Sequence, residues 1–301
     1  MLRTRFAPAP TGLLHLGHVV NAMHVWGLAG TCGASVVLRI EDHDRERSRP
    51  TYERTILDDL DWLGFVPHLY PTDVFRGGRC ESRQSDRQAI YLSHAARLLA
   101  AGRVYGCVCT RQDLAVHRGT GGDNALAYPG TCRSRGIPPG DHVAWRVRLE
   151  DIEPGPIDEL LAGPVPPERA GDPVIRDRRG NWTYQFAVTV DDLDQQIDLV
   201  VRGRDLLDST PLQVRLARLF GRDVPPRFAH HPLMMRTATD KLSKSAGDTG
   251  VSELRAAGWT AERLLGHAAH RIGLVAVDRP IKAIDVPALF DEAFRRIRPS
   301  P

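Results

Sequence analysis

Lysine is almost absent from this chain. Its 301 residues contain 37 arginines and only 3 lysines, two of which stand together in Lys241-Leu242-Ser243-Lys244-Ser245. A lysine ammonium is compact and mobile, and the planar guanidinium of arginine does not replace it at every site. The retained pair therefore indicates a site with a specific need for lysine, and phosphate chemistry is the leading candidate.

Long hydrophobic runs are also missing. No apolar stretch approaches the roughly 18 residues that a membrane-spanning helix requires, and the N-terminus has no signal-peptide pattern. The chain has 42% hydrophobic residues, enough for a sizeable core, and a net charge of +3, which permits a polyanionic partner without predicting one. We predict a cytoplasmic enzyme of one or two domains that has no membrane association.

Cysteine is scarce, and its pattern excludes a disulfide framework. The chain has 5 cysteines at uneven positions, whereas disulfide scaffolds carry dense, paired cysteines. Cys107-Val108-Cys109 followed by Cys132 instead has the spacing of a metal site. A structural zinc takes four ligands, and the candidates for the fourth are Tyr128, His117 and His142. The alternative is a set of unrelated thiols.

A turn-rich loop near the N-terminus leads into a helical pattern. Apolar residues recur at helical spacing from Leu16 to Gly27, so His15 and His18 fall on the first turn of a helix. A helix N-terminus presents unpaired N–H groups and the positive end of the dipole, and two imidazoles extend that set of donors. The arrangement fits a phosphate under attack, and the alternative is a pair of surface histidines.

The order of predicted elements favours an α/β fold with a parallel sheet. Strands at 2–6 and 35–40 bracket the histidine helix and begin a βαβ unit. Helices follow at 51–63 and 84–101, the sheet pattern returns at 182–190 and 197–201, and further helices are expected at 211–220, 252–257 and 260–272. We predict four parts: the first half of a Rossmann-type catalytic domain (1–103), an inserted subdomain with the cysteines (104–180), the second half with the lysine loop (181–250), and a C-terminal helical segment (251–301).

Two motifs together resemble the signatures of class I aminoacyl-tRNA synthetases. They are His15-Leu16-Gly17-His18 and the lysine motif at 241–245, in this order and more than two hundred residues apart. The resemblance covers residues 3 to about 275. The segments 38–44 and 202–211 are similar to the glutamyl branch of these synthetases in particular. A full glutamyl-tRNA synthetase continues into a helical anticodon-binding domain for which we expect no residues here, so the chain is most similar to the glutamyl-Q tRNA(Asp) synthetase family.

The resemblance implies a Rossmann-type catalytic domain with an inserted zinc-bearing subdomain and a short C-terminal helical part. The family's metal pattern, Cys-x-Cys followed by Tyr-x-x-x-Cys, matches Cys107, Cys109, Tyr128 and Cys132. It therefore implies a structural Zn²⁺ and favours Tyr128 over either histidine as the fourth ligand.

The resemblance also implies a reaction and its residues. ATP with Mg²⁺ activates L-glutamate to glutamyl-adenylate, and the glutamyl group passes to queuosine in the anticodon loop of tRNA(Asp). The implied catalytic residues are His15, His18, Lys241 and Lys244, and the implied ATP-binding residues are His15, Gly17, His18 and Lys244. The implied glutamate-binding residues are Arg5, Ala7, Ala9, Glu41, Tyr184 and Arg202.

The residue types fit these roles. Arg5 and Arg202 can grip the side-chain carboxylate of glutamate through paired hydrogen bonds, and Glu41 can hold its ammonium. Ala9 stands where the family commonly has serine, so contact there must come from the backbone. We interpret Arg39 and Asp42 as structural ion-pair residues.

Two alternatives remain open at this point. The first is a truncated glutamyl-tRNA synthetase that charges a tRNA acceptor end, and the second is a non-catalytic nucleotide-binding or RNA-binding paralogue. Both histidines and both lysines of the motifs are present, which argues against the second. We expect a monomer.

Overall fold

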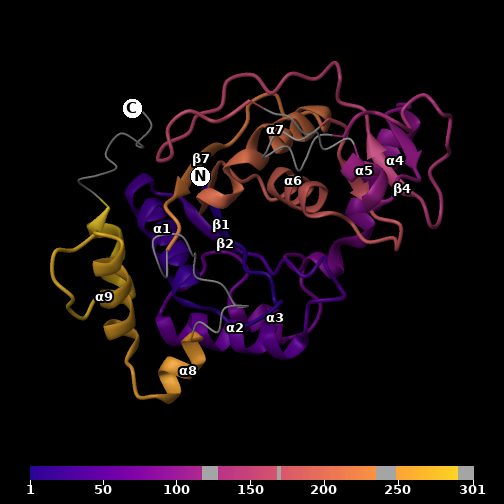
Figure 1. The fold of residues 1–301 in the computed structure, drawn as a ribbon. Helices are drawn as coiled ribbons and strands as arrows, with labels where there is room; N and C mark the ends of the chain where they lie inside the picture. Colours follow the sequence, from indigo (N-terminus) through magenta and orange to yellow (C-terminus); the bar gives the residue numbers. More distant parts are fainter. Residues whose placement is uncertain (117–127, 168–170, 235–248, 291–301) are drawn as a thin grey trace.

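A four-stranded parallel sheet forms the centre of the molecule (Figure 1). The computed structural model describes residues 1–116, 128–167, 171–234 and 249–290. The strands are β1 (Arg3–Phe6), β2 (Ser35–Leu38), β6 (Leu199–Gly203) and β7 (Arg227–His231), and their order is β2-β1-β6-β7. The strand order reverses between β1 and β6, and ligands of open α/β sheets bind at the carboxyl ends of the strands beside such a point.

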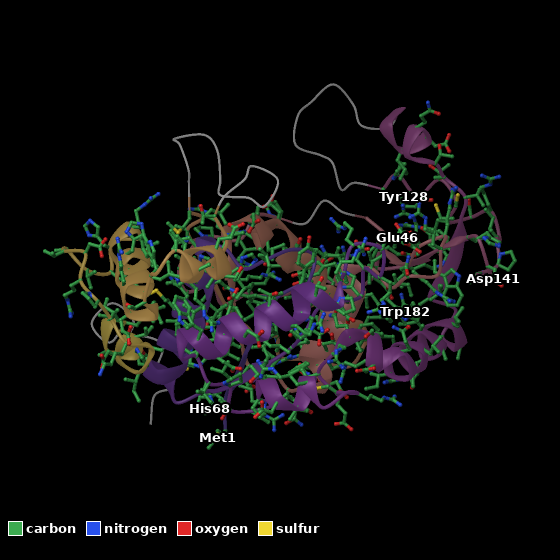
Figure 2. The ribbon with its side chains drawn as sticks, turned by 90° about the horizontal axis from the view of Figure 1, so that it is seen from below. Met1, Glu46, His68, Tyr128, Asp141 and Trp182 are labelled. Carbon is green, nitrogen blue, oxygen red and sulfur yellow. The ribbon has the colours of Figure 1, made fainter. Side chains whose placement is uncertain are left out.

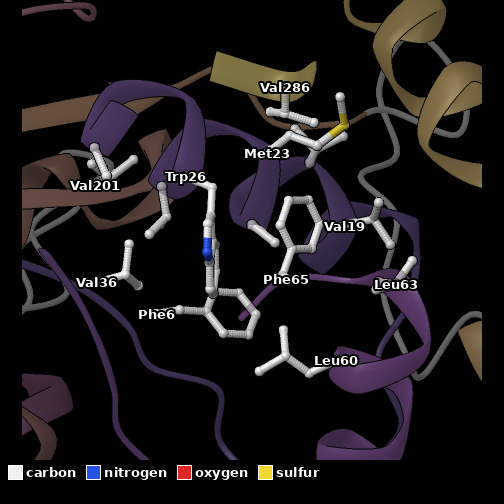
Figure 3. Packing of buried hydrophobic residues seen from close by; sticks show 14 of the residues in the cluster. Phe6, Val19, Met23, Trp26, Val36, Leu60, Leu63, Phe65, Val201 and Val286 are labelled. Atoms are coloured by element: carbon white, nitrogen blue, oxygen red, sulfur yellow. The ribbon is translucent and has the colours of Figure 1, made fainter. Parts of the chain in front are cut away.

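Helix α1 (Leu16–Cys32) crosses from β1 to β2 and packs on the sheet. Its Trp26 ring lies 5.5 Å from Phe6 of β1 and 4.9 Å from Phe65, which follows α2 (Pro50–Leu63) (Figure 3). Side chains of this kind contribute about 1.5–3 kcal/mol each when they are fully buried. The packing holds the first turn of α1 rigidly at the edge of the sheet where the strands end.

A second, three-stranded antiparallel sheet lies at one end of the molecule (Figure 1). It follows α3 (Thr72–Arg76), η1 (Gln84–Arg87) and α4 (Gln88–Ala100), and consists of β3 (Val104–Cys107), β4 (Ala144–Val147) and β5 (Val174–Arg176), with the short helix α5 (Arg111–Val116) after β3. These strands fall inside the predicted insertion at 104–180. The exact limits of that subdomain stay a prediction.

The predicted strand at 182–190 is wrong, because this segment begins a helix. Helix α6 runs over Tyr184–Asp194. Aromatic and β-branched residues make the segment resemble a strand, but Phe186 and Val190, four residues apart, are both buried in one cluster. The Phe186 ring packs against Trp182 and Phe220 at 4.9 and 5.8 Å. Tertiary packing with α7 (Thr210–Leu219) thus overrides the local preference.

The C-terminal part covers the outer face of α1. It contains α8 (Val251–Ala256), α9 (Ala261–Arg271) and η4 (Ala283–Leu289), and the helices predicted at 252–257 and 260–272 are confirmed. A side chain at Gly27 of α1 would lie 2.2 Å from the Phe290 ring, so glycine permits the close approach of η4. None of the helices in the described residues has the length and apolar character needed to cross a membrane.

Candidate active site

A cavity of about 790 Å³ opens at the carboxyl ends of the parallel strands. Arg5 lies near the end of β1, Glu41 follows β2, Arg202 lies near the end of β6 and His231 ends β7, and all four line it. The other predicted site residues that line it are Ala7, His15, Gly17, His18 and Tyr184. The fold therefore brings together residues that are up to about two hundred positions apart in the chain.

His15 and His18 cap the first turn of α1 with their rings. Nδ1 of His15 accepts from the Gly17 N–H at 3.1 Å, and Nδ1 of His18 accepts from the His15 N–H at 3.1 Å. A neutral imidazole has one donor and one acceptor nitrogen. Because both Nδ1 atoms accept, the hydrogen of each neutral ring is on Nε2, so both rings present a donor at the N-terminus of the helix.

Gly17 keeps this arrangement open. A side chain at position 17 would lie 2.9 Å from the His15 ring, which is closer than carbon atoms approach without displacement. Any larger residue would push His15 away from its capping position. Glycine at position 17 is therefore required by the packing of the His15 ring.

Arg202 is buried and surrounded by neutral acceptors. Its exposed fraction is 4%. Nε donates to Nε2 of His230 at 2.9 Å, and the terminal nitrogens donate to Oε1 of Gln213 at 2.7 Å, Oγ1 of Thr210 at 2.8 Å and the Leu206 carbonyl at 3.3 Å. No carboxylate in the described part of the chain forms an ion pair with it. Burial accordingly lowers the pKa of Arg202.

Arg39, unlike Arg202, forms ion pairs with buried carboxylates. It is fully buried and pairs with Glu41 at 3.2 Å and with Asp192 at 2.8 Å, while Asp191 lies 3.9 Å away. Asp192 also accepts from Arg5 at 3.1 Å. Burial acts to raise the pKa of Asp192, but the two guanidiniums hold it below its usual value. The interpretation of Arg39 as an ion-pair residue is confirmed, whereas Arg202 forms no ion pair with a described carboxylate.

A buried carboxylate and imidazole stand behind Arg202. Nδ1 of His230 donates to Oε2 of Glu159 at 2.6 Å. Glu159 also accepts from the N–H groups of Leu161, Ala162 and His230. Burial acts to raise the pKa of Glu159, but these donors hold it at about 2, and burial lowers the pKa of His230. The neutral ring thus has a single tautomer, whose Nε2 accepts from Arg202.

Two of the residues predicted to bind glutamate differ in their placement. Tyr184 begins α6 and lines the cavity, and burial raises the pKa of its phenol. Ala9 is not among the residues that line the cavity, and its carbonyl accepts from the Thr11 N–H at 2.8 Å. Asp42 pairs with Arg45 and accepts from the Ser85 N–H at 2.7 Å, so its interpretation as a structural residue is also confirmed.

Three cysteines and a tyrosine converge in the three-stranded sheet region. The sulfur atoms of Cys107, Cys109 and Cys132 all lie within 4.8 Å of one another. Oη of Tyr128 lies 3.6 Å from Sγ of Cys107, and Sγ of Cys109 lies 3.5 Å from Sγ of Cys132. Ligands at about 2.3 Å from a tetrahedral zinc are about 3.8 Å apart. Tyr128 lies at the same end of the molecule as Asp141 (Figure 2).

The structure describes one of the two histidines predicted as alternative ligands. His142 lies outside the group of possible metal ligands formed by the described residues. His117 lies in the range 117–127, outside the residues that the structure describes.

Lys241 and Lys244, the predicted catalytic lysines, lie in the range 235–248, which is likewise outside the residues that the structure describes. Their roles stay predictions.

Sequence reasoning missed three residues around Arg202. His230 and Gln213 contact its guanidinium directly, and Glu159 contacts it through His230. His230 has a signal, since it lies near the carboxyl end of a buried strand, where binding residues of α/β sheets gather. Glu159 lies in an irregular segment before α6, and no local pattern singles it out.

The fold and the cavity define a parallel α/β protein with a cavity at the strand ends that two buried arginines line. The family model for the catalytic domain of class I tRNA synthetases (E and Q) matches residues 1–278. The chain belongs to this family, it is a class I aminoacyl-tRNA synthetase-like ligase, and within the family it groups with the glutamyl-Q tRNA(Asp) synthetases.

Individual relatives agree with this assignment. A protein named Glutamyl-Q tRNA(Asp) synthetase from Symbiobacterium thermophilum is 41% identical, with 97% of this chain and 93% of the relative covered. Glutamate–tRNA ligase 1 from Novosphingobium aromaticivorans is 34% identical, and the match covers 96% of this chain but 65% of that protein. The solved glutamate tRNA ligase from Elizabethkingia meningosepticum superposes with a TM-score of 0.70 at 27% identity, over 95% of this chain and 64% of its own.

Proposed function

We propose that the protein activates L-glutamate with ATP to form glutamyl-adenylate and transfers the glutamyl group to queuosine in the anticodon loop of tRNA(Asp). The observation that carries the first step is the buried Arg202, whose charge has no carboxylate partner among the described residues and which lines the cavity. A buried, unpaired charge is costly. A carboxylate ligand would supply the missing partner.

Glutamate fits the other charges of the cavity. Arg202 and Arg5 hold the side-chain carboxylate, and Glu41, which also lines the cavity, holds the ammonium. Both bonds from Arg39 to Glu41 end on Oε1, so Oε2 remains for the ligand. Tyr184 and Ala7, which also line the cavity, complete the proposed glutamate site. This arrangement leaves the α-carboxylate of the substrate directed away from both arginines, as the reaction requires.

ATP is placed against the first turn of α1. The Nε2–H groups of His15 and His18 donate to its phosphates beside Gly17, and Lys241 and Lys244 neutralise the leaving pyrophosphate together with Mg²⁺. An oxygen of the α-carboxylate attacks the α-phosphorus, and the bond to pyrophosphate breaks. A hydroxyl of the RNA then attacks the acyl carbon, loses its proton, and releases AMP. The protein contributes position and charge rather than a nucleophile.

Zinc is proposed as a structural ion of the three-stranded sheet region. Three thiolates and the Tyr128 phenol supply four ligand atoms at spacings near those of a tetrahedral site. The Arg146 guanidinium lies 3.5 Å from the centroid of the Tyr128 ring and packs it in place. With four protein ligands the ion would hold the fold and take no part in the reaction.

A truncated glutamate–tRNA ligase is the second candidate. It is favoured by the 34% identity to the glutamate–tRNA ligase from Novosphingobium aromaticivorans, of which this chain spans 65%. The queuosine assignment is favoured by the 93% coverage of the relative from Symbiobacterium thermophilum. The two candidates share the first step and differ in the RNA group that receives glutamate.

ATP–pyrophosphate exchange tests both candidates. The purified protein is given glutamate, glutamine or aspartate, with and without tRNA. Exchange with glutamate alone, without tRNA, supports the proposed function. Exchange that appears only when tRNA is added favours the truncated ligase. If no amino acid supports exchange, the enzymatic proposal is abandoned in favour of a non-catalytic paralogue.

A further inference from the structure

A second cavity, of about 680 Å³, lies beside α2 and next to the active site. Six arginines line it, and four carboxylates accompany them: Arg45, Arg49, Arg54, Arg76, Arg79 and Arg83, with Asp42, Glu53, Asp58 and Asp86. The residues proposed above for glutamate and ATP do not line it. Arginines outnumber carboxylates in this lining, and they divide into those that form ion pairs and those that do not.

Three of these arginines are held in ion pairs. Arg83 pairs with Glu53 at 2.6 Å and Asp86 at 2.8 Å, Arg76 pairs with Asp58 at 2.8 Å, and Arg45 pairs with Asp42. Arg83 also donates to the Phe75 carbonyl at 2.8 Å. These pairs engage all four carboxylates and fix the wall of the cavity between α2 and α3.

The other three arginines have no ion pair in the residues that the structure covers. Arg49 donates only to the backbone carbonyls of Glu46 and Ser48, and Arg79 donates to the Asp86 carbonyl at 3.3 Å. Arg54 has neither a hydrogen bond nor an ion pair with any described residue. All three are exposed, so their guanidiniums can turn toward a ligand in the cavity.

A hydroxyl donor lies at the same place. Pro50 and Glu53 of the first turn of α2 line the cavity, but proline has no N–H and the Glu53 N–H already donates to the Arg49 carbonyl at 3.1 Å. The Oγ atom of Ser48, which also lines the cavity, is buried and has no hydrogen-bond partner among the described residues. A hydroxyl and several arginines are donors that phosphate groups use in proteins.

One segment of chain separates this cavity from the active site. Pro10 and Arg49 line the second cavity, whereas Thr11 and Arg47 line the first. Glu46 in this segment pairs with Arg179, which follows β5 (Figure 2 labels Glu46). A polymer with its reactive group in the active site would therefore reach the second cavity with neighbouring units.

We propose that this cavity, at the N-terminus of α2, binds backbone phosphates of the RNA substrate. This proposal rests on the proposed function only in that the acceptor is an RNA. Arg49, Arg54 and Arg79 contact the phosphodiester groups, the Ser48 hydroxyl donates to one of them, and Arg83 holds the wall. Contacts to phosphate position an RNA without reading its sequence.

The test compares two double variants of equal charge. Arg54→Gln/Arg79→Gln removes two cavity arginines, and Arg97→Gln/Arg263→Gln removes two exposed arginines of α4 and α9, which line neither cavity. Binding of tRNA(Asp) is measured by fluorescence anisotropy from 50 to 300 mM salt. Each lost phosphate contact reduces the slope of log affinity against log salt by about 0.7–0.9, so the cavity variant loses roughly 1.5 in slope and the control keeps the wild-type slope.

Two further measurements separate the possible outcomes. Pyrophosphate exchange with glutamate, run without RNA, stays at the wild-type rate in both variants, and its absence in the wild type would count against the proposed function and not against this site. Inorganic phosphate is titrated separately. If phosphate binding is lost in the cavity variant while tRNA(Asp) affinity is unchanged, the site serves a small anion, and the RNA proposal is overturned. Equal loss of RNA affinity in both variants overturns it as well.

Discussion

The Nε atom of Arg202 donates to Nε2 of His230 at 2.9 Å, although the two residues lie on different strands of the sheet. The other ring nitrogen of His230 donates to Glu159 at 2.6 Å. A carboxylate, an imidazole and a guanidinium thus form one buried line that ends at the cavity. Glu159 keeps His230 in the tautomer that accepts from Arg202, and His230 in turn fixes the plane of the guanidinium.

Loss of the carboxylate at position 159 should weaken glutamate binding. We expect Glu159→Gln and His230→Gln to raise KM for glutamate about tenfold with a smaller change in kcat, because a hydrogen bond to a charged group contributes about 1.5–3 kcal/mol. Pyrophosphate exchange at varied glutamate gives both constants. Asp158→Asn is the matched control, since Asp158 pairs with Arg227 at the surface. An unchanged KM in both variants would show that Arg202 needs no support.

Arg202 and Arg39 should respond differently to the same substitution. Arg202→Met removes a charge that no described carboxylate pairs but leaves buried acceptors unpaired, so we expect a smaller fall in Tm than for Arg39→Met together with a loss of about 10² or more in kcat/KM for glutamate. Arg39→Met leaves Glu41 and Asp192 without their shared partner and should cost about 3–5 kcal/mol of stability. Thermal unfolding and exchange kinetics are measured on both. An equal or larger fall in Tm for Arg202→Met would contradict the absence of an ion pair at this residue.

The capping and donor roles of His15 can be separated. Asparagine is a good N-cap residue, so His15→Asn should keep α1 capped while it removes the Nε2 donor. We expect a near-wild-type Tm and an exchange rate lower by about 10²–10³. His15→Ala loses both functions and should also unfold at lower temperature. If His15→Asn exchanged pyrophosphate at the wild-type rate, the ring would serve only as a cap.

Zinc content should depend on the cysteine cluster alone. We expect about one zinc per chain by metal analysis of the wild type, a strong reduction in Cys107→Ser, and no change in Cys32→Ser. Cys32 lies outside the cluster and only donates weakly to the Ala29 carbonyl. A chelator should lower Tm, because a structural zinc contributes folding energy. Wild-type protein without zinc, or Cys107→Ser with the wild-type amount, would remove the metal from the proposal.

Asp59 should make stability fall as pH rises. Burial raises its pKa to about 7, and within the described residues its Oδ2 has no hydrogen-bond partner. The folded chain then binds a proton more tightly than the unfolded chain, so the free energy of unfolding decreases between about pH 4 and pH 7 and levels off above. Asp59→Asn should abolish this decrease and raise Tm at pH 8 but not at pH 4. Equal shifts in Tm at the two pH values would contradict the assignment.

Local sequence patterns were sufficient to predict the elements that depend on residues close together in the chain. Helical periodicity predicted the helices at 51–63 and 260–272, and placed His15 and His18 on a first turn. The spacing of the cysteines predicted a cluster that the structure brings within 4.8 Å. Periodicity and spacing report contacts within about one turn of a helix or one loop, and these features depend on nothing more.

Only the tertiary structure decided what surrounds each buried charge. Arg39 and Arg202 look alike in the sequence, but one meets carboxylates and the other meets His230, Gln213 and Thr210. The segment at 184–194 is a helix because Phe186 packs among rings from distant residues. These partners are up to about 150 positions away, and the cost of a buried charge depends on which groups the folded chain places around it. A local stretch of sequence contains neither these distant partners nor the groups that determine the cost of a buried charge.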